Sequence, residues 1–384
     1  MRGLILMPEI QRVIRGRGSL RKIMDLAAKL EIRHPMIVGG STLTSRLLRK
    51  VPDLISAPVF SGYHPNPELS DAEAGAEMYR ANGCDGIISI GGGSAIDTAK
   101  AVHTLLFCGD MEAATAGNLP EKMQLSHIAV PGTAGSGAEA TQNAVVYVNG
   151  KKTSLSHPDL RPDGVLLDAE LLESLPEYHK KSCAMDALAQ GIESYWCEAS
   201  NDDSRVHAYL AILGVLDNLK AYLAGDLHAA DEMLDASYQS GKAIQITRTT
   251  AAHAMSYQLT KTFGIAHGHA VMLTLPTLWE MMTEDEEAAP ILKEISRMMR
   301  LGDPLMVPRL LRGIMADIGL EIPAFPDNQT LDMLTDSVNP ERLANHPVKL
   351  SRNEIRNTYV KSLLPMEGAE LQACLDIWKY YGAQ

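Results

Sequence analysis

Residues able to bind a divalent metal are concentrated in the second half of the sequence. Asp186 and Gln190 lie four residues apart in "MDALAQGIESYW", where the apolar spacing predicts a helix, so both side chains lie on one helix face. His253 and His267 are fourteen residues apart, and a helix, a loop and the start of a second helix can bring their imidazoles together. One carboxylate and two imidazoles suit Fe(II) or Zn(II) and leave a coordination position for a substrate oxygen. Spacing alone leaves open that these residues are unrelated.

Two glycine-rich turns occur in the first half of the sequence. "GGGSAIDTAK" (91–100) follows the apolar run "GIISI" and begins a predicted helix, so backbone N–H groups at the helix N-terminus suit an anion such as a pyrophosphate. The turn lacks the G-x-G-x-x-G spacing and the lysine of a P-loop, and tight packing is an alternative reason for its glycines. "PGTAGSGAEAT" (131–141) is a second turn of this kind. Two such turns favour one extended, phosphate-bearing ligand.

The elements that must position these residues are of two kinds. Short apolar runs ended by glycine or proline predict buried strands at 34–40, 53–62, 85–93, 126–133 and 163–169. Helical patterns lie between them, such as 70–83, with Ser70 as the cap and Gly83 at the end. This alternation predicts a parallel sheet with helical crossovers. Residues 1–20 predict a first strand rather than a signal peptide.

The pattern changes near residue 172. Beyond it, apolar residues recur at three- and four-residue spacing, which predicts a helical region of six to nine helices. We therefore expect two domains, an α/β domain at 1–172 and an all-α domain at 173–384.

Composition excludes several classes of partner. The 384 residues carry a formal net charge of −12, which argues against nucleic acids and anionic membranes as partners. The sequence has no apolar run of about 18 residues, so no membrane span is expected. Its five cysteines are scattered without a C-x-x-C pair, which argues against a disulfide framework and a thiolate zinc site and favours the cytoplasm.

Four sequence blocks carry a resemblance to a known family. "GGGSAIDTAK", "PGTAGSGAEAT", "MDALAQGIESYW" and "HAMSYQLTKTFGIAHGHAV" resemble, in this order, signature blocks of the iron-containing (group III, metal-dependent) alcohol dehydrogenases, and "FSGYHPNPE" resembles another. The resemblance covers nearly the whole chain. It implies a dehydroquinate synthase-like architecture, with a Rossmann-like N-terminal nucleotide-binding domain, a helical C-terminal domain, and cofactor and metal in the cleft between them.

The resemblance places Asp186, His253 and His267 on three metal-ligand positions. The chain departs from the family at Gln190, where many members have a fourth ligand histidine. We include Gln190 among the ligands, although its amide oxygen is a weaker ligand than imidazole. Two alternatives are that it holds a water or only forms hydrogen bonds. Loss of the metal site and of activity is a further alternative.

The resemblance also implies which residues line a nicotinamide dinucleotide. The positions that match are Gly92, Gly93, Ser94, Asp97, Thr133, Ser136 and Lys152. The first of the apolar runs ends in Gly39, Gly40, Ser41 and Thr42, where NAD-preferring relatives carry an acidic residue that would repel a 2′-phosphate. We therefore expect NADP(H) to be preferred, with NAD(H) as the alternative.

Two residues are candidates for proton transfer. Tyr257 follows His253 by four residues, at a position where several relatives have a histidine thought to relay protons. Tyrosine can donate a proton but relays protons poorly at neutral pH. His269 lies beside the ligand His267, and its alternative is a packed histidine at a helix start.

The stretch "TRTTAAHAMSY" is similar to the phosphonoacetaldehyde reductase branch of the family. Arg248 and Thr249 precede His253 closely enough to bind an anionic group, although an interhelical salt bridge is the alternative for Arg248. Thr141 and Asn143 match positions that line the substrate pocket in relatives. The resemblance thus implies metal-assisted reduction of phosphonoacetaldehyde to 2-hydroxyethylphosphonate, with a small anionic aldehyde or alcohol as the bound partner.

Other functions remain open. A neutral short-chain aldehyde or diol, of the lactaldehyde or propanediol type, is the main alternative substrate. A metal-dependent lyase or cyclase on the same fold fits less well, because dehydroquinate synthase has a Glu at the first ligand position and several basic residues. A non-catalytic relative is the last alternative. The family also implies a homodimer or a larger homo-oligomer.

Overall fold

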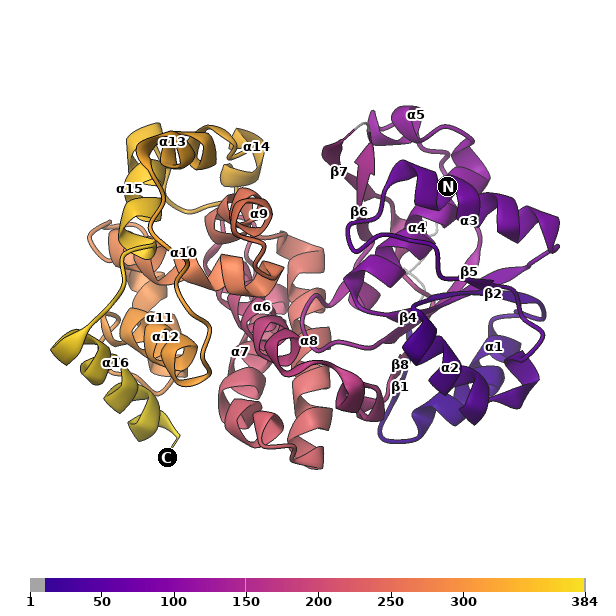
Figure 1. Ribbon diagram of the computed structural model, residues 1–384, viewed down its shortest axis with the longest axis horizontal. Helices are drawn as coiled ribbons and strands as arrows, with labels where there is room; N and C mark the ends of the chain where they lie inside the picture. Colours follow the sequence, from indigo (N-terminus) through magenta and orange to yellow (C-terminus); the bar gives the residue numbers. More distant parts are fainter. Residues whose placement is uncertain (1–10, 149, 383–384) are drawn as a thin grey trace, which may run out of the picture. The chain divides into compact units, whose positions relative to one another are not determined.

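A computed structural model describes residues 11–148 and 150–382, and the start of the first strand predicted at 1–20 lies outside them. The chain divides into two compact units (Figure 1). The first contains residues up to 133 together with 138–173, and the second contains residues 134–137 together with 174 onwards. None of the described helices is long and apolar enough to cross a membrane.

The first unit is built on a six-stranded parallel sheet. Across the sheet its strands are β1 (Arg12–Arg15), β8 (Gly164–Leu167), β5 (Ser126–Pro131), β4 (Gly86–Gly91), β2 (Pro35–Gly39) and β3 (Val59–Phe60). Every residue of β2, β4 and β8 is buried, which is expected for parallel strands covered on both faces. The α/β prediction is therefore confirmed. The long strand predicted at 53–62 is wrong, since a 3-10 turn (Pro52–Leu54) occupies its first part and only β3 follows.

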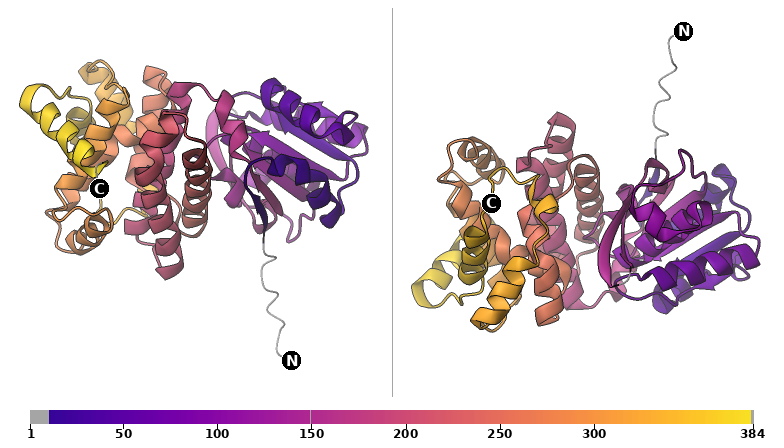
Figure 2. Two further views of the ribbon diagram at one scale, coloured as in Figure 1. Left: turned by 90° about the horizontal axis from the view of Figure 1, so that it is seen from below. Right: turned by 90° about the horizontal axis from the view of Figure 1, so that it is seen from above.

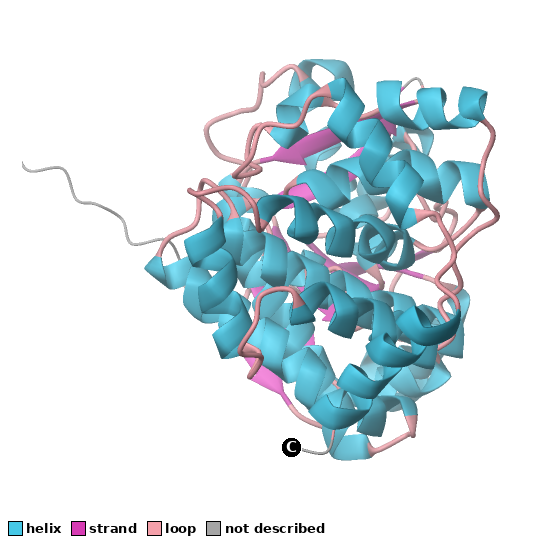
Figure 3. Cartoon of the chain, turned by 90° about the vertical axis from the view of Figure 1, so that its left-hand side faces the viewer, coloured by secondary structure: helices cyan, strands magenta, loops and turns pink. Residues whose placement is uncertain are grey.

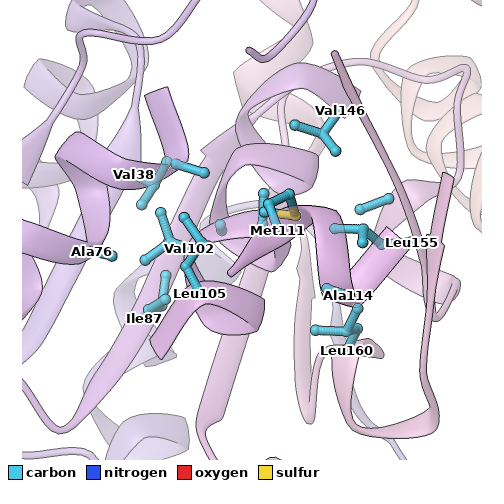
Figure 4. Packing of buried hydrophobic residues seen from close by; sticks show 14 of the residues in the cluster. Val38, Ala76, Ile87, Val102, Leu105, Met111, Ala114, Val146, Leu155 and Leu160 are labelled. Carbon is cyan, nitrogen blue, oxygen red and sulfur yellow. The ribbon is translucent and has the colours of Figure 1, made fainter. Parts of the chain in front are cut away.

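Helices cover both faces of this sheet, as both views in Figure 2 show. They are α1 (Ile23–Lys29), α2 (Ser41–Lys50), α3 (Leu69–Ala81) and α4 (Gly93–Cys108), while the short helix α5 (Met111–Thr115) packs on α4. Alternate residues of β2 point to opposite faces, so Met36 and Val38 pack in one apolar cluster and Ile37 packs in another. Figure 4 shows the first cluster, where Val102 and Leu105 of α4 lie beside Val38 and Ile87.

The predicted helix at 70–83 is present as α3, but its cap differs. Glu68 is the N-cap and forms a capping box with Asp71, so the prediction that Ser70 caps the helix is wrong. Gly83 follows the helix with a φ of 59°, a backbone conformation that glycine adopts easily.

An antiparallel hairpin of β6 (Asn143–Val148) and β7 (Lys151–Ser156) completes the first unit and was not expected from the sequence. Short 3-10 turns also occur, at Ser19–Lys22, Ala138–Ala140, Pro158–Leu160 and Ala169–Ser174.

The second unit consists of helices joined by loops, as the colouring of Figure 3 shows. Its helices are α6 (Glu177–Trp196), α7 (Asp202–Leu223), α8 (Leu227–Thr247), α9 (Ala251–Phe263), α10 (His267–Met282), α11 (Ala289–Met298), α12 (Met306–Asp317), α13 (Asn328–Asp336), α14 (Pro340–Leu343), α15 (Arg352–Ser362) and α16 (Gly368–Tyr381). The described residues thus contain eleven α-helices here, more than the six to nine predicted, because short helices such as α14 carry little periodic signal.

Candidate functional site

The structure brings three of the predicted metal ligands together. Asp186 comes from α6, His253 from α9 and His267 from the first turn of α10, and one ligand atom of each lies within 4.8 Å of the others. The distance from Asp186 Oδ1 to Nε2 is 3.2 Å for His253 and 3.9 Å for His267. Asp186 and His253 are buried, whereas His267 is partly exposed. The group therefore has a buried side and an accessible side.

Hydrogen bonds place a hydrogen on Nδ1 of both imidazoles. His253 Nδ1 contacts Glu193 Oε2, and a carboxylate only accepts, so the hydrogen is on Nδ1. His267 Nδ1 lies 3.3 Å from Ser256 Oγ, whose own hydrogen is donated to the His253 carbonyl oxygen at 2.8 Å. His267 therefore donates from Nδ1 as well. Both Nε2 atoms face Asp186, and a bound metal would use them as donors, displacing the Nε2 hydrogen that His253 shares with Asp186 Oδ1 at 3.2 Å.

Glu193 is the residue of this site that the sequence prediction missed. It is completely buried on α6, seven residues after Asp186, and its Oε1 accepts hydrogen bonds from Thr250 Oγ1 at 2.6 Å and the Ala252 amide at 2.9 Å. Burial alone would lower the pKa of His253, but Glu193 and Asp186 raise it to about 9. Burial alone would raise the pKa of Glu193, but His253 and Thr250 bring it below its usual value. A carboxylate–histidine pair of this kind orients a metal-binding imidazole.

Gln190 lies beside the three ligands with its amide already hydrogen-bonded. Its side chain is buried, its Oε1 accepts a hydrogen bond from Ser240 Oγ at 2.8 Å, and its Nε2 donates to the Ser136 carbonyl oxygen at 3.3 Å. Ser136 is also a predicted dinucleotide contact. Its carbonyl oxygen is therefore already hydrogen-bonded to Gln190 of α6.

The two candidates for proton transfer occupy different surroundings. The ring of Tyr257 stacks on that of His267, with centroids 5.7 Å apart and an interplanar angle of 4°, and its hydroxyl accepts a hydrogen bond from Arg342 at 2.9 Å. His269 is buried, and its Nδ1 lies 3.1 Å from the hydroxyl of Tyr178. Burial lowers the pKa of His269. Tyr257 is therefore in contact with a predicted metal ligand, whereas the ring contact of His269 is with Tyr178.

Arg248 lies in the loop between α8 and α9, in an unusual backbone conformation. Its φ of 63° and ψ of −174° are costly for a residue with a Cβ atom, and its side chain is exposed. Asn345 Nδ2 donates to the carbonyl oxygens on either side, those of Thr247 at 2.7 Å and Thr249 at 3.3 Å. The same loop ends at Thr250, the residue that binds Glu193. Asn345 thus holds the loop that leads from Arg248 to the predicted metal site.

The first glycine-rich turn lies beside Gly132 and Thr133, the part of the second turn that belongs to the first unit. Gly91 ends β4 with a φ of 154°, Gly92 is the N-cap of α4, and the Gly132 amide donates to the Gly91 carbonyl oxygen at 2.8 Å. A Cβ atom on Gly92 would lie 3.2 Å from Thr133 Cγ2. The N-terminus of α4, which begins with Gly93 and Ser94, is therefore flanked by Thr133.

A buried lysine connects α4, the helix after the first turn, to the end of the second turn and the start of β6. Lys100 is completely buried, and its Nζ donates to the carbonyl oxygens of Ala138 at 2.7 Å, Thr141 at 2.8 Å and Asn143 at 2.8 Å. Burial lowers its pKa to about 8. Thr141 and Asn143, predicted to line the substrate pocket, are thus held through their backbone.

Asp97, on α4, is hydrogen-bonded to the hairpin of β6 and β7. Its Oδ2 accepts a hydrogen bond from the Val145 amide of β6 at 3.0 Å, and Lys152 lies on the neighbouring strand β7. At the end of β2, Gly40 is the N-cap of α2, Ser41 and Thr42 are exposed, and the first turn of α2 has no acidic residue.

Family models match most of the chain. The model described as "Iron-containing alcohol dehydrogenase" matches residues 10–169, and that of the C-terminal region of the Fe-containing alcohol dehydrogenase family matches residues 181–310. This chain belongs to the iron-containing alcohol dehydrogenase family. It is therefore an oxidoreductase of the alcohol dehydrogenase type, and the family implies a divalent metal and NAD(H).

Several known proteins resemble the chain to different degrees. It is 35% identical to the probable alcohol dehydrogenase EutG of Escherichia coli, over 69% of this chain and 70% of that protein. It is 35% identical to the phosphonoacetaldehyde reductase of Streptomyces viridochromogenes, over 56% of this chain and 58% of that protein. The sulfoacetaldehyde reductase of Bifidobacterium kashiwanohense, solved with NAD⁺, superposes with a TM-score of 0.86 at 26% identity, over 94% of this chain and 99% of that one.

The residues present fit the metal that the family implies. One carboxylate and two imidazole Nε2 atoms face one another, and each imidazole has a partner at Nδ1, which is the arrangement that first-row divalent metals need. Sequence reasoning found the three donors but missed Glu193, Lys100 and Asn345. For Glu193 a signal existed, because its seven-residue spacing from Asp186 puts both on one helix face.

Proposed function

We propose that this chain reduces phosphonoacetaldehyde to 2-hydroxyethylphosphonate with NADPH and one bound divalent metal. The observation that carries the reductase assignment is the convergence of Asp186, His253 and His267 with both Nε2 atoms directed to the carboxylate. The anionic substrate is supported by Arg248 and by the named substrates of two relatives. Phosphonoacetaldehyde and sulfoacetaldehyde are both two-carbon aldehydes with an anionic tetrahedral group.

Asp186, His253 and His267 would hold the metal. When bound, the metal supplies a Lewis acid for the carbonyl oxygen and the reduced nicotinamide supplies a hydride for the carbonyl carbon. Glu193 keeps the hydrogen of His253 on Nδ1, and Ser256 does the same for His267. These two residues therefore keep the donor atoms in the form that binds a metal.

The carbonyl oxygen gains a proton as the carbon gains the hydride, so the product is a primary alcohol. Tyr257 is the proposed donor because it lies against His267 and its hydroxyl accepts from Arg342, so its own hydrogen is not used in that bond. His269 stays a prediction as the second candidate. A Tyr257→Phe variant separates the two, since a donor role requires a lower kcat at unchanged metal content.

Substrate selection is assigned to Arg248 and Thr249. The guanidinium is exposed, and its backbone is held by Asn345 in a conformation that a free loop would not keep. A phosphonate can accept two parallel hydrogen bonds from a guanidinium, which a neutral aldehyde cannot. Thr141 and Asn143 stay predictions as further pocket residues.

The dinucleotide is assigned to the two glycine-rich turns and to the start of α2. Gly92, Gly93 and Ser94 stand at the N-terminus of α4 and Thr133 lies beside them, whereas Asp97 is engaged with the hairpin that carries Lys152. A preference for NADPH is supported by the acid-free first turn of α2, where backbone amides and the hydroxyls of Ser41 and Thr42 are available to a 2′-phosphate. Comparable kcat/KM for NADH and NADPH would refute that preference.

The test is a turnover assay on protein loaded anaerobically with Fe(II) or Zn(II), with phosphonoacetaldehyde and butanal compared. Arg248→Ala should raise KM for phosphonoacetaldehyde by about 10–100-fold, the loss expected for a charged hydrogen bond, with little effect on butanal. Arg297→Ala is the matched control, because Arg297 is also an exposed arginine but lies on a different helix, α11. Equal effects on both aldehydes would refute the substrate role of Arg248.

A neutral short-chain aldehyde is the second candidate substrate, supported by 28% identity to the lactaldehyde reductase of Escherichia coli over 68% of this chain and 71% of that protein. Faster turnover of butanal or lactaldehyde than of phosphonoacetaldehyde would establish it. Absence of turnover with either metal and every aldehyde would instead point to a non-catalytic relative.

A further inference from the structure

We propose that Gln190 is a positioning residue that holds Asp186, and is not a fourth metal ligand. The proposal rests on the metal site proposed above and concerns a position where the sequence alone suggested a ligand. Gln190 is 4% exposed, and each end of its amide already has a protein partner.

The partners of Gln190 decide which way its amide points. On one side are the Ser136 carbonyl oxygen and the Asp186 carboxylate, and both are acceptors only. The amide must therefore turn its NH₂ group to that side. Burial alone would raise the pKa of Asp186, whereas His267, His253 and the hydrogen bond from Gln190 lower it. Gln190 thus donates a hydrogen bond to the carboxylate of Asp186 while its own amide is held by Ser136 and Ser240.

On the other side, Ser240 Oγ lies 2.8 Å from Gln190 Oε1 and 2.8 Å from the Ser237 carbonyl oxygen. Because the NH₂ group faces the acceptors Ser136 and Asp186, Oε1 is the atom that faces Ser240 and can accept its hydroxyl hydrogen. Reversing the amide would set Oε1 against the two acceptors Ser136 and Asp186. The oxygen that could have bound a metal is therefore committed to α8.

The backbone that Gln190 binds is itself packed tightly. A Cβ atom added to Gly135 would lie 2.7 Å from Cys183 Cβ on α6, and one added to Gly137 would lie 2.4 Å from Gly241 Cα on α8. The Ser136 carbonyl oxygen is therefore fixed by its neighbours and gives Gln190 a firm support.

One face of α6 thus carries one predicted metal ligand and two residues that hold ligands by hydrogen bonds. Asp186, Gln190 and Glu193 follow at four- and three-residue spacing, with Gln190 holding the ligand of its own helix and Glu193 holding His253 of α9. The protein then offers three ligands instead of four, and more coordination positions stay available to substrate and water.

Replacing Ser240 tests the proposal, because the two possible roles of Gln190 predict opposite changes in Zn(II) affinity. If Gln190 positions Asp186, Ser240→Ala loosens the amide and weakens Zn(II) binding, by about tenfold on the scale of outer-shell partners. If Gln190 is a ligand, the same substitution releases Oε1 and tightens binding. Ser237→Ala is the matched control, because this buried serine lies on the same helix and its hydroxyl has no partner among the described residues.

The measurement is the Zn(II) dissociation constant, by competition with a chromophoric chelator and without substrate. Weaker binding by Ser240→Ala alone supports the proposal, and tighter or unchanged binding overturns it. A crystal structure of the Zn(II)-loaded wild-type chain decides the matter if the variant does not fold. Oε1 within about 2.2 Å of the metal overturns the proposal. Failure of the wild-type chain to bind Zn(II) or Fe(II) refutes the metal site itself.

Discussion

Replacing Glu193 by glutamine should weaken metal binding, although Glu193 is not a ligand. Oε1 of Glu193 faces the Thr250 hydroxyl and the amides of Ala252 and His253, whereas Oε2 faces His253 Nδ1. In Glu193→Gln the remaining oxygen must stay with the two backbone amides, which only donate. The new NH₂ group then points at His253 Nδ1 and moves the imidazole hydrogen to Nε2, the atom that faces Asp186.

The expected loss is about 10–100-fold in metal affinity, or about 1.4–2.8 kcal/mol, the range found for outer-shell partners of ligand histidines. A second effect changes with pH. The pKa of His253 is raised to about 9, so below pH 9 a metal must displace its proton, and wild-type affinity should rise with pH up to that value. Without the negative charge of Glu193, His253 holds this proton less tightly. The metal affinity of the variant should therefore depend less on pH than that of the wild type.

The difference between the two proteins should therefore be greatest near pH 9. Zn(II) dissociation constants from pH 7 to 9.5 test this, with circular dichroism of the metal-free proteins as a check on folding. Glu294→Gln is the control, because it changes an exposed carboxylate that binds only the Tyr195 hydroxyl in the described contacts. Equal affinity of Glu193→Gln and wild type at pH 9 would refute the tautomer argument.

Lys100, His103 and Asn345 each give a further measurable outcome. Lys100→Met removes the ammonium donor shared by three carbonyl oxygens in a buried environment and should lower the free energy of unfolding by about 3–5 kcal/mol in urea titrations. Burial lowers the pKa of His103 to about 4, so the folded state binds fewer protons than the unfolded state. The neutral, buried form of His103 therefore contributes fully to the free energy of unfolding above pH 6.5, and this contribution is lost as the pH falls towards 4. The free energy of unfolding should drop by about 3 kcal/mol over this range, and less in His103→Leu. Asn345→Ala should raise KM for phosphonoacetaldehyde several-fold more than KM for butanal, because it releases the backbone on both sides of Arg248.

The sequence predicted the parallel sheet and the helical second half because their signals are local. Mostly apolar runs such as "GIISI" produce β4, and apolar residues at three- and four-residue spacing produce long helices such as α6. The strand at 53–62 failed because Pro52 and Pro58 allow a 3-10 turn and a short edge strand instead. The hairpin of β6 and β7 was missed although β6 alternates partly buried and buried residues.

Residue type and family resemblance predicted the ligands of the candidate site, but not the hydrogen bonds that hold them. Asp186, His253 and His267 could be named because metals favour these side chains. The contacts of Gln190 with Ser240 and Ser136 join residues 50 and 54 positions apart, and no local pattern encodes such a pairing. Lys100 was hidden for a related reason, since a lysine is seldom buried and its three carbonyl partners come from an irregular segment.

The path of the chain between its two units constrains how this protein can be rebuilt. The chain passes between them after residues 133, 137 and 173, because four residues of the second glycine-rich turn belong to the helical unit. A fragment ending at residue 173 would carry Gly135 and Gly137 without Cys183 and Gly241, the residues they pack against. Exchange of halves between relatives at a single junction would therefore combine a turn from one parent with helices from the other. Chimeras should succeed more often when residues 134–137 are taken from the parent that supplies α6 and α8.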